Sequence, residues 1–305
     1  MPLNRWFEYG STRCCTKSCA LNRELRKLTD ALPVLVLVPD LVTALTSTPF
    51  ERPKEFEGRR IEDVTQRELE AAVAKRQEDT LARAKYFGGD PAGLIGNSAE
   101  FRDIYEITKG SRPWFVIDPP DGRLPYLPGM RERALDNDKH RERDPVGQCH
   151  MHGVPRVMFP PFPLEILQDR EYVVILAETE HGVRIILTDG RPFLTNYSSW
   201  NGDSRGRWDG DTLVVEVRGL NGRSWLDQAG NFMGAGARVV ERFRLTGKDS
   251  LDYQATVENP SVFSRPFTVR VPLRRRPADV ELLEYGCIEG ERDAVHMPST
   301  KGETK

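Results

Sequence analysis

The sequence predicts a mainly β protein: an antiparallel β-barrel, lipocalin-like or a similar closed meander, with an N-terminal helical arm. Two observations support this fold class. Runs of β-branched and aromatic residues recur through residues 164–290, and the segments between them are short and carry almost no helical pattern. A sheet without helices to cover its faces normally closes into a barrel or folds into a sandwich. A small barrel of this kind can hold one small ligand.

Seven strand-like runs account for most of this region. Thr179–Gly182 separates the first two and has the composition of a hairpin turn, and Lys248–Asp249 makes a tight turn between the two longest. The predicted strands span Tyr172–Glu178, Val183–Thr188, Thr212–Val217, Ala237–Leu245, Leu251–Val257, Phe267–Leu273 and Val280–Tyr285.

The remaining parts of the chain differ in character from the β region. Thr65–Glu68 has the capping-box pattern and predicts a helix over Ile61–Tyr86, and a short charged helix is expected over Gly129–His140. The predicted parts are an irregular leader or arm (1–60), a helix with a Pro-rich connector (61–163), the β-barrel domain (164–290) and a tail (291–305).

Residues 23–47 form a candidate targeting segment. The apolar run Ala31–Leu45 has the length of a signal-peptide core and follows basic residues. Asp40 and the long stretch before the run argue against this interpretation. The compartment therefore stays open at this point: periplasmic or secreted if the segment is a signal, and cytoplasmic if it is not.

Composition and missing motifs exclude several function classes. The chain has 44 Lys and Arg against 46 Asp and Glu, so no net basic charge is available for nucleic-acid binding. No apolar run of membrane-spanning length occurs. A P-loop, a G-x-S-x-G elbow and a dinucleotide-binding glycine motif are all missing from the sequence, which disfavours nucleotide hydrolysis, hydride transfer and serine-type acyl transfer. We expect no cofactor.

The five cysteines fall into two groups. Cys14, Cys15 and Cys19 lie in the N-terminal stretch with a spacing that does not match zinc ligands. Cys149 and Cys287 stand alone and far apart. In a cytosolic protein such cysteines are more often small buried side chains, whereas in an exported protein they more often form a bridge.

The most distinctive segment is a Gly- and Asp-rich loop, Trp200–Asp211. Glycines permit positive φ angles and aspartates accept backbone N–H groups, so one interpretation is a rigid loop that closes a barrel end. The other is a ligand-binding loop, in which Trp200 and Trp208 line the mouth of a pocket while Asp203 and Arg205 supply polar contacts.

This loop, W-N-G-D-S-x-G-x-W-D-G-D-T-L-V-V, resembles the signature of a widespread family of uncharacterised and commonly exported bacterial proteins. The resemblance continues over roughly residues 49–290 in seven further short blocks. They are I-D-P-P-D-G-R (117–123), G-V-P-R after Cys149, P-x-E-I-L-Q (163–168), D-G-R-P (189–192) with W-L-D (225–227), V-V-E-R-F (239–243), and E-L-L-E-Y-x-C (281–287).

The resemblance implies an all-β protein with an N-terminal helical arm, export behind a signal peptide, and a disulfide between Cys149 and Cys287. Some relatives also suggest the breakdown of aromatic compounds. The chain departs from the family pattern at His150–His152, where the family usually has a Leu-Pro pair, and in its long leader.

Strand alternation points to an inward carboxylate. In the run 239–245, Val239, Glu241, Phe243 and Leu245 share one face, which is mostly apolar and therefore the inner one. Desolvation favours the neutral form of a carboxyl group unless a cation lies beside it, and such a group can act as a general acid. The alternative is a structural ion pair with an inward arginine.

Histidines offer a partner for this carboxylate. His181, in the predicted hairpin, is the best candidate for the general acid or base. His150 and His152 form an H-x-H pair, but two imidazoles without an obvious third ligand do not make a metal site, and none is predicted.

Two functions of different class follow. The first is a cofactor-independent lyase or isomerase that acts on a hydrophobic, aromatic small molecule. Its predicted catalytic residues are Glu241, His181 and Asp203, and its predicted substrate-binding residues are Trp200, Arg205, Trp208 and Phe243. The second is a non-catalytic carrier for an apolar ligand. In either case the predicted partner is a small molecule, not nucleic acid or a membrane span, and the chain is a candidate homo-oligomer.

Overall fold

The structure is a computed structural model that describes residues 35–39, 50–72, 74–75, 113–160, 162–179, 182–276 and 281–284. Contacts divide the chain into residues 1–34 and residues 35–305, and every described residue belongs to the second unit.

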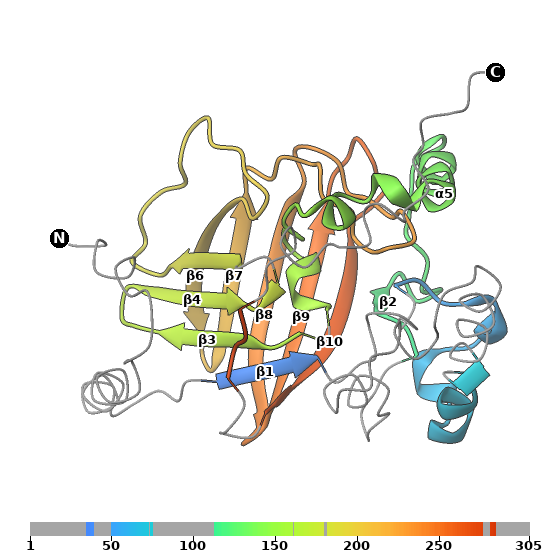
Figure 1. Ribbon diagram of the computed structural model, residues 1–305, viewed down its shortest axis with the longest axis horizontal. Helices are drawn as coiled ribbons and strands as arrows, with labels where there is room; N and C mark the ends of the chain where they lie inside the picture. Colours follow the sequence, from blue (N-terminus) through green and yellow to red (C-terminus); the bar gives the residue numbers. More distant parts are fainter. Residues whose placement is uncertain are drawn as a thin grey trace. The chain divides into compact units, whose positions relative to one another are not determined.

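One mixed sheet of ten strands dominates the described residues (Figure 1). Its hydrogen-bonded order is β1-β3-β4-β5-β6-β7-β8-β9-β10-β2, and β1 also pairs with β10. The strands span β1 Leu35–Pro39, β2 Val116–Asp118, β3 Leu164–Gln168, β4 Tyr172–Ala177, β5 Gly182–Leu187, β6 Asp203–Asp209, β7 Thr212–Arg218, β8 Arg238–Gly247, β9 Ser250–Glu258 and β10 Phe267–Arg275.

The mainly β class is confirmed, but the purely antiparallel expectation is wrong at one place. β5 and β6 are parallel, through Ile186 opposite Ser204 and Leu187 opposite Arg205. Two parallel neighbouring strands need a connection that returns the chain to the end of the sheet at which the first strand begins. Residues 188–202, the return loop, form this connection. The expectation that Trp200–Asp211 is a loop is wrong for Asp203–Asp209, which form strand β6.

The free edge of β10 is covered by two short strands. β2 pairs with its first half, and β1 pairs with its second half through Leu37 opposite Arg275 and Pro39 opposite Leu273. On its other side β1 pairs with β3. Residues 1–60 are therefore not wholly irregular, because part of the candidate targeting segment forms β1 within the sheet.

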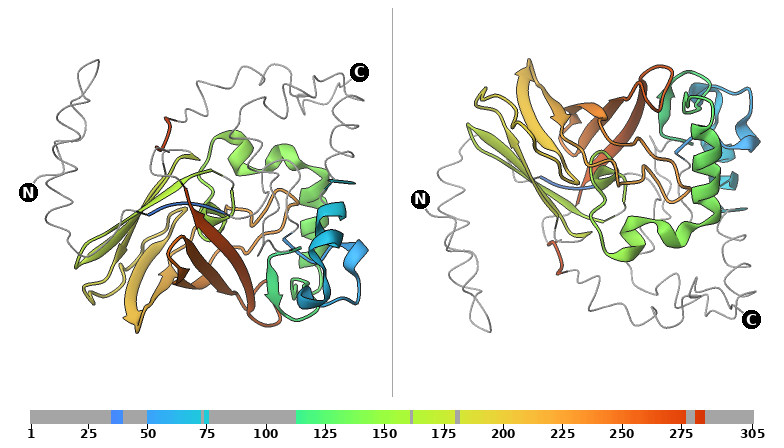
Figure 2. Two further views of the ribbon diagram at one scale, coloured as in Figure 1. Left: turned by 90° about the horizontal axis from the view of Figure 1, so that it is seen from below. Right: turned by 90° about the horizontal axis from the view of Figure 1, so that it is seen from above.

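Several local expectations can be compared with the described residues. The capping box is confirmed: Thr65 N–H donates to Glu68 Oε2 (2.8 Å), and Glu68 N–H donates to Thr65 Oγ1 (3.3 Å). The helix expected over Gly129–His140 is α5, Met130–Lys139. The strand expected over Val280–Tyr285 is wrong for 281–284, which are irregular. In both views of Figure 2, α5 lies beside the segment of residues 50–75.

The inner face of the sheet forms the core. Cα-paired residues in adjacent strands share a face, and the row Val215, Glu241, Ala255 and Val269 is completely buried across β7 to β10.

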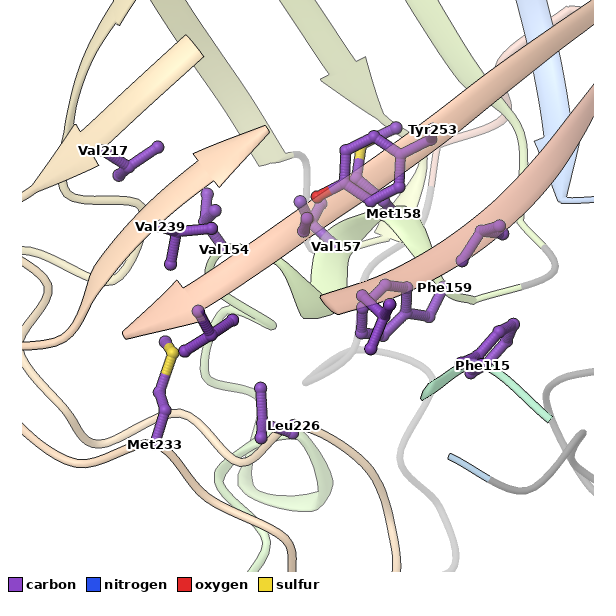
Figure 3. Close-up of a cluster of buried hydrophobic side chains, with 14 of the residues drawn as sticks. Phe115, Val154, Val157, Met158, Phe159, Val217, Leu226, Met233, Val239 and Tyr253 are labelled. Atoms are coloured by element: carbon purple, nitrogen blue, oxygen red, sulfur yellow. The ribbon is translucent and has the colours of Figure 1, made fainter. Parts of the chain in front are cut away.

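The strands have two different ends. The hairpin end is defined by the β6–β7 turn (209–212) and the β8–β9 turn (247–250). At the opposite, capped end, the 3₁₀ segment η6 (Arg156–Met158) and its neighbours pack into the core. Figure 3 shows Val154 beside Val239 and Met158 beside Tyr253.

Candidate functional site

The inner face carries one buried polar network, centred on Glu241. This carboxylate has no exposed surface, and its Oε1 accepts hydrogen bonds from Arg184 Nη1 (2.9 Å) and from the hydroxyl of Tyr253 (2.7 Å). Its Oε2 is paired with Arg184 Nη2. Arg184 also donates from Nε and Nη2 to Ser204 Oγ, at 3.2 and 3.1 Å. The network thereby joins β5, β6, β8 and β9 across the interior.

Burial and charge fix the proton positions in this network. Burial raises the pKa of Tyr253 well above its usual range, and the negative charge of Glu241 adds to the shift, so the phenol keeps its proton and donates it. Desolvation acts to lower the pKa of Arg184, but the adjacent Glu241 reverses this, and the overall shift is upward. Arg184 is therefore a permanent cation inside the sheet.

Of the two interpretations of Glu241, the structure supports the structural ion pair with an inward arginine. Val239 and Phe243 flank Glu241 along β8, as the alternation predicts, and Arg184 reaches it from β5. The carboxylate is thus held by a bidentate arginine and by the Tyr253 hydroxyl. The structure brings neither Asp203 nor Trp200 to this network.

Asp203 and Arg205 fasten the return loop to the outer face of the sheet. Asp203 Oδ2 accepts from Leu194 N–H (2.7 Å), and Oδ1 is paired with Arg205 Nη1. Arg205 donates from Nη2 to the carbonyl of Pro192 (2.9 Å) and from Nε to that of Arg191 (3.2 Å). Both side chains alternate away from Ser204, so they point away from the interior, and the predicted roles in catalysis and substrate binding lack support.

Two glycines of the W-x-G-D-S-x-G-x-W block allow the chain to pack closely against the neighbouring strands. Gly202 has φ +63°, and a Cβ there would lie 2.5 Å from the carbonyl oxygen of Arg218. At Gly206 a Cβ would lie 2.9 Å from a methyl group of Ile186. The motif is therefore explained by the way the return loop and β6 fit against the neighbouring strands.

Trp200 and Trp208 do not share one pocket mouth. Trp200 precedes β6, whereas Trp208 lies near the end of β6, roughly 17 Å beyond Asp203 along the extended strand. Trp200, at the capped end, stacks on the imidazole of His150 (5.3 Å between centroids, 19° between planes), and Arg223 lies 5.9 Å from its ring centroid. Trp208 lies at the hairpin end.

The hairpin end exposes apolar side chains that belong to the inner face. Trp208 pairs with the buried Leu213 and is 48% exposed, and Leu245 pairs with the buried Leu251 and is 51% exposed. Phe243 lies one step further in, is 6% exposed and packs on the ring of Tyr253 at 5.0 Å. Of the four residues predicted to bind substrate, Trp208 and Phe243 therefore lie on the inner face at this end.

The remaining site predictions concern histidine and cysteine. His181 lies outside the described residues, and so does Cys287. Cys149 is disulfide-bonded, but its pairing with Cys287 stays a prediction. His152 is buried at the capped end, where its carbonyl accepts from Ser224 Oγ.

Within the described ranges, no cluster of three or more His, Cys, Asp or Glu is arranged to hold a metal ion, and no helix is long and apolar enough to cross a membrane.

Sequence reasoning missed Arg184 and Tyr253 as parts of this arrangement. Arg184 lies in a run of apolar residues, and its alternation with Ile186 was the signal that it points inward. Tyr253 shares the inner face with Leu251 and Ala255, so the same counting would have found it.

Comparison with known proteins adds no assignment: no family model matches the chain, and no curated protein matches it. The resemblance based on the W-x-G-D-S-x-G-x-W block therefore stays a prediction.

Proposed function

We propose that this protein binds an apolar, aromatic-sized small molecule at the hairpin end of its sheet, without catalysing a reaction. The observation that carries the proposal is the exposure of two inner-face side chains, Trp208 (48%) and Leu245 (51%). Inner-face residues elsewhere in β6–β10 are buried in the core, so apolar surface that would normally be covered is available to a ligand here.

The proposal includes a barrel-like enclosure. The pairing of β1 with both β3 and β10 supports it, because it joins the first and last long strands of the meander. In a small β-barrel the interior narrows to the width of side chains or one ligand. Val154 and Met158 pack into the core at the capped end, so we take the hairpin end as the route by which the ligand enters.

The chemistry of the inner face favours an uncharged ligand. Near Trp208 it presents Leu213, Phe243 and Leu245, which offer dispersion contacts and an indole ring on which a flat molecule can stack. The nearest buried charges, Arg184 and Glu241, neutralise one another. A charged ligand would lose hydration without gaining a partner.

The ion pair between Arg184 and Glu241 also favours binding without catalysis. An acid–base enzyme needs a group that exchanges protons with the substrate, and Glu241 would first have to leave both Arg184 and Tyr253. The lyase or isomerase predicted from the sequence remains a prediction whose support would have to come from His181.

Fluorescence titration with N-phenyl-1-naphthylamine, an uncharged apolar probe, tests the proposal. We expect saturable binding that Trp208→Ala and Leu245→Ser each weaken by about tenfold, the loss expected for removing an anchoring side chain. Trp200→Ala is the matched control, because it removes the same side chain at the capped end, and its affinity should equal that of the wild type. Equal affinity of Trp208→Ala and wild type, or a loss confined to Trp200→Ala, would refute the proposal.

A further inference from the structure

β5 has an inverted burial pattern that the proposed function does not use. Its buried side chains are Arg184 and Ile186, whereas Val183 and Ile185 point outward and are 55% and 53% exposed. Large β-branched side chains on an outer face are unusual when a charged residue occupies the inner face of the same strand. The outer face of β5 therefore needs an explanation of its own.

The neighbouring strands extend this outer apolar surface. Val183 lies opposite Leu176 and Ile185 lies opposite Val174 on β4, and Val174 in turn lies opposite Leu167 on β3. The β3–β5 outer face, as we name it, consists of Leu167, Tyr172, Val174, Leu176, Val183, Ile185 and Leu187. Because Val173, Ile175 and Ala177 on the same strands are buried in the core, β4 is apolar on both faces. That pattern is typical of a strand that is covered on both sides.

We propose that the β3–β5 outer face is the interface through which two copies of this chain form a two-fold dimer. A two-fold interface brings the same patch of both copies together, and it therefore requires a surface that complements itself. An apolar sheet face meets this condition, since two such faces pack as the layers of a β-sandwich do, about 10 Å apart.

Charge favours a second copy over other partners. The outward side chains of β3–β5 include one acidic residue, Glu165, and no lysine or arginine. A second carboxylate, Glu178, directly follows β4 and accepts from Leu283 N–H (2.9 Å), so residues 281–284 lie against this end of the face. The face thus offers no cation to a nucleic acid or an anionic surface, and no row of charges to a charged peptide. Burial already raises the pKa of Glu165, and a second apolar face that covered it would further favour its neutral form.

The available area sets the strength of the dimer. From the exposures of Tyr172 (39%), Val183 (55%) and Ile185 (53%), with smaller contributions from the other four residues, the face presents roughly 400 Å² of apolar surface per copy. Two copies would bury about 800 Å² of it, which is below the roughly 1,000 Å² of a stable specific interface and is typical of a weak, transient one. A weak dimer with a micromolar dissociation constant is expected.

Sedimentation velocity of the full chain over about 1–200 µM tests this proposal. We expect the wild type to shift from monomer to dimer, and Val183→Lys/Ile185→Lys to need at least about tenfold higher concentration for the same shift. Leu135→Lys is the matched control, because Leu135 is 54% exposed but lies on α5, and it should dimerise like the wild type. Because both substituted side chains of the double variant are exposed, its unfolding temperature should remain close to that of the wild type.

A second variant guards against an indirect effect of the lysines. Ile185→Cys should form an intermolecular disulfide under mild oxidation if the two-fold axis passes near β5, and Leu135→Cys, on α5, should not. A wild type that stays monomeric throughout the concentration range overturns the proposal. So does a lysine double variant that dimerises normally, or equal crosslinking of the two cysteine variants.

Discussion

Removing the positive charge of Arg184 should destabilise the fold strongly. Arg184→Met keeps the length and apolar stem of the side chain but leaves Glu241 buried with Tyr253 as its remaining partner. Breaking a buried ion pair by removing one partner typically costs about 3–5 kcal/mol. For a folded unit of this size, 1 kcal/mol shifts the unfolding temperature by about 2–4 °C, so a decrease of roughly 10 °C is expected.

Thermal and urea unfolding, followed by circular dichroism with the disulfide intact, measures this effect. Arg207→Met is the control, because Arg207 is exposed on β6, and it should stay within about 0.5 kcal/mol of the wild type. Arg184→Met/Glu241→Leu removes both charges and should be more stable than Arg184→Met alone. An Arg184→Met protein within about 1 kcal/mol of the wild type would refute the reasoning, as would a double variant less stable than the single one.

Three further outcomes are expected. Gly202→Ala should cost more than about 2 kcal/mol in unfolding experiments, because its Cβ would meet the carbonyl of Arg218, whereas Gly210→Ala, which has a similar φ of +61° but open space around it, should cost about 1 kcal/mol. Burial raises the pKa of Glu165 in the folded state, so the contribution of this residue to stability is present at acid pH and is lost as the pH rises through that pKa. Glu165→Gln should therefore be more stable than the wild type at pH 8, by less than about 1 kcal/mol. Near pH 4 the difference in stability should disappear. Asp203→Asn should lower the unfolding temperature by weakening the attachment of the return loop, and the affinity for the apolar probe should not change.

The sequence was sufficient to place Glu241 on the inner face, because alternation along a long strand depends only on the local period. It was not sufficient to identify Arg184 as the partner. The two residues lie in strands that are not neighbours in the sheet order, so their contact depends on how the sheet curves. The sequence alone could therefore not decide between the general-acid and the ion-pair interpretation of Glu241.

The Gly- and Asp-rich loop shows a similar limit. Its turn residues were recognised, but the parallel pairing of β5 and β6 was not, because a short parallel contact leaves no pattern in a single sequence. Without that pairing, Trp200 and Trp208 look like neighbours. In the structure β6 separates them, and one of the two remains a candidate for ligand binding.

The β1 strand could not be found from composition. Its residues, Leu35–Pro39, have the apolar character of a targeting segment, and only their pairing with β3 and β10 distinguishes the two interpretations of this run.

The central claim is that an apolar ligand binds beside Trp208, and ¹⁹F NMR of protein labelled with 5-fluorotryptophan tests it most directly. The chain has five tryptophans, and each resonance can be assigned by a Trp→Phe substitution. On titration with N-phenyl-1-naphthylamine, the account predicts that the Trp208 resonance shifts in a saturable manner while that of Trp200 does not. A shift of the Trp200 resonance with no change at Trp208 would contradict it.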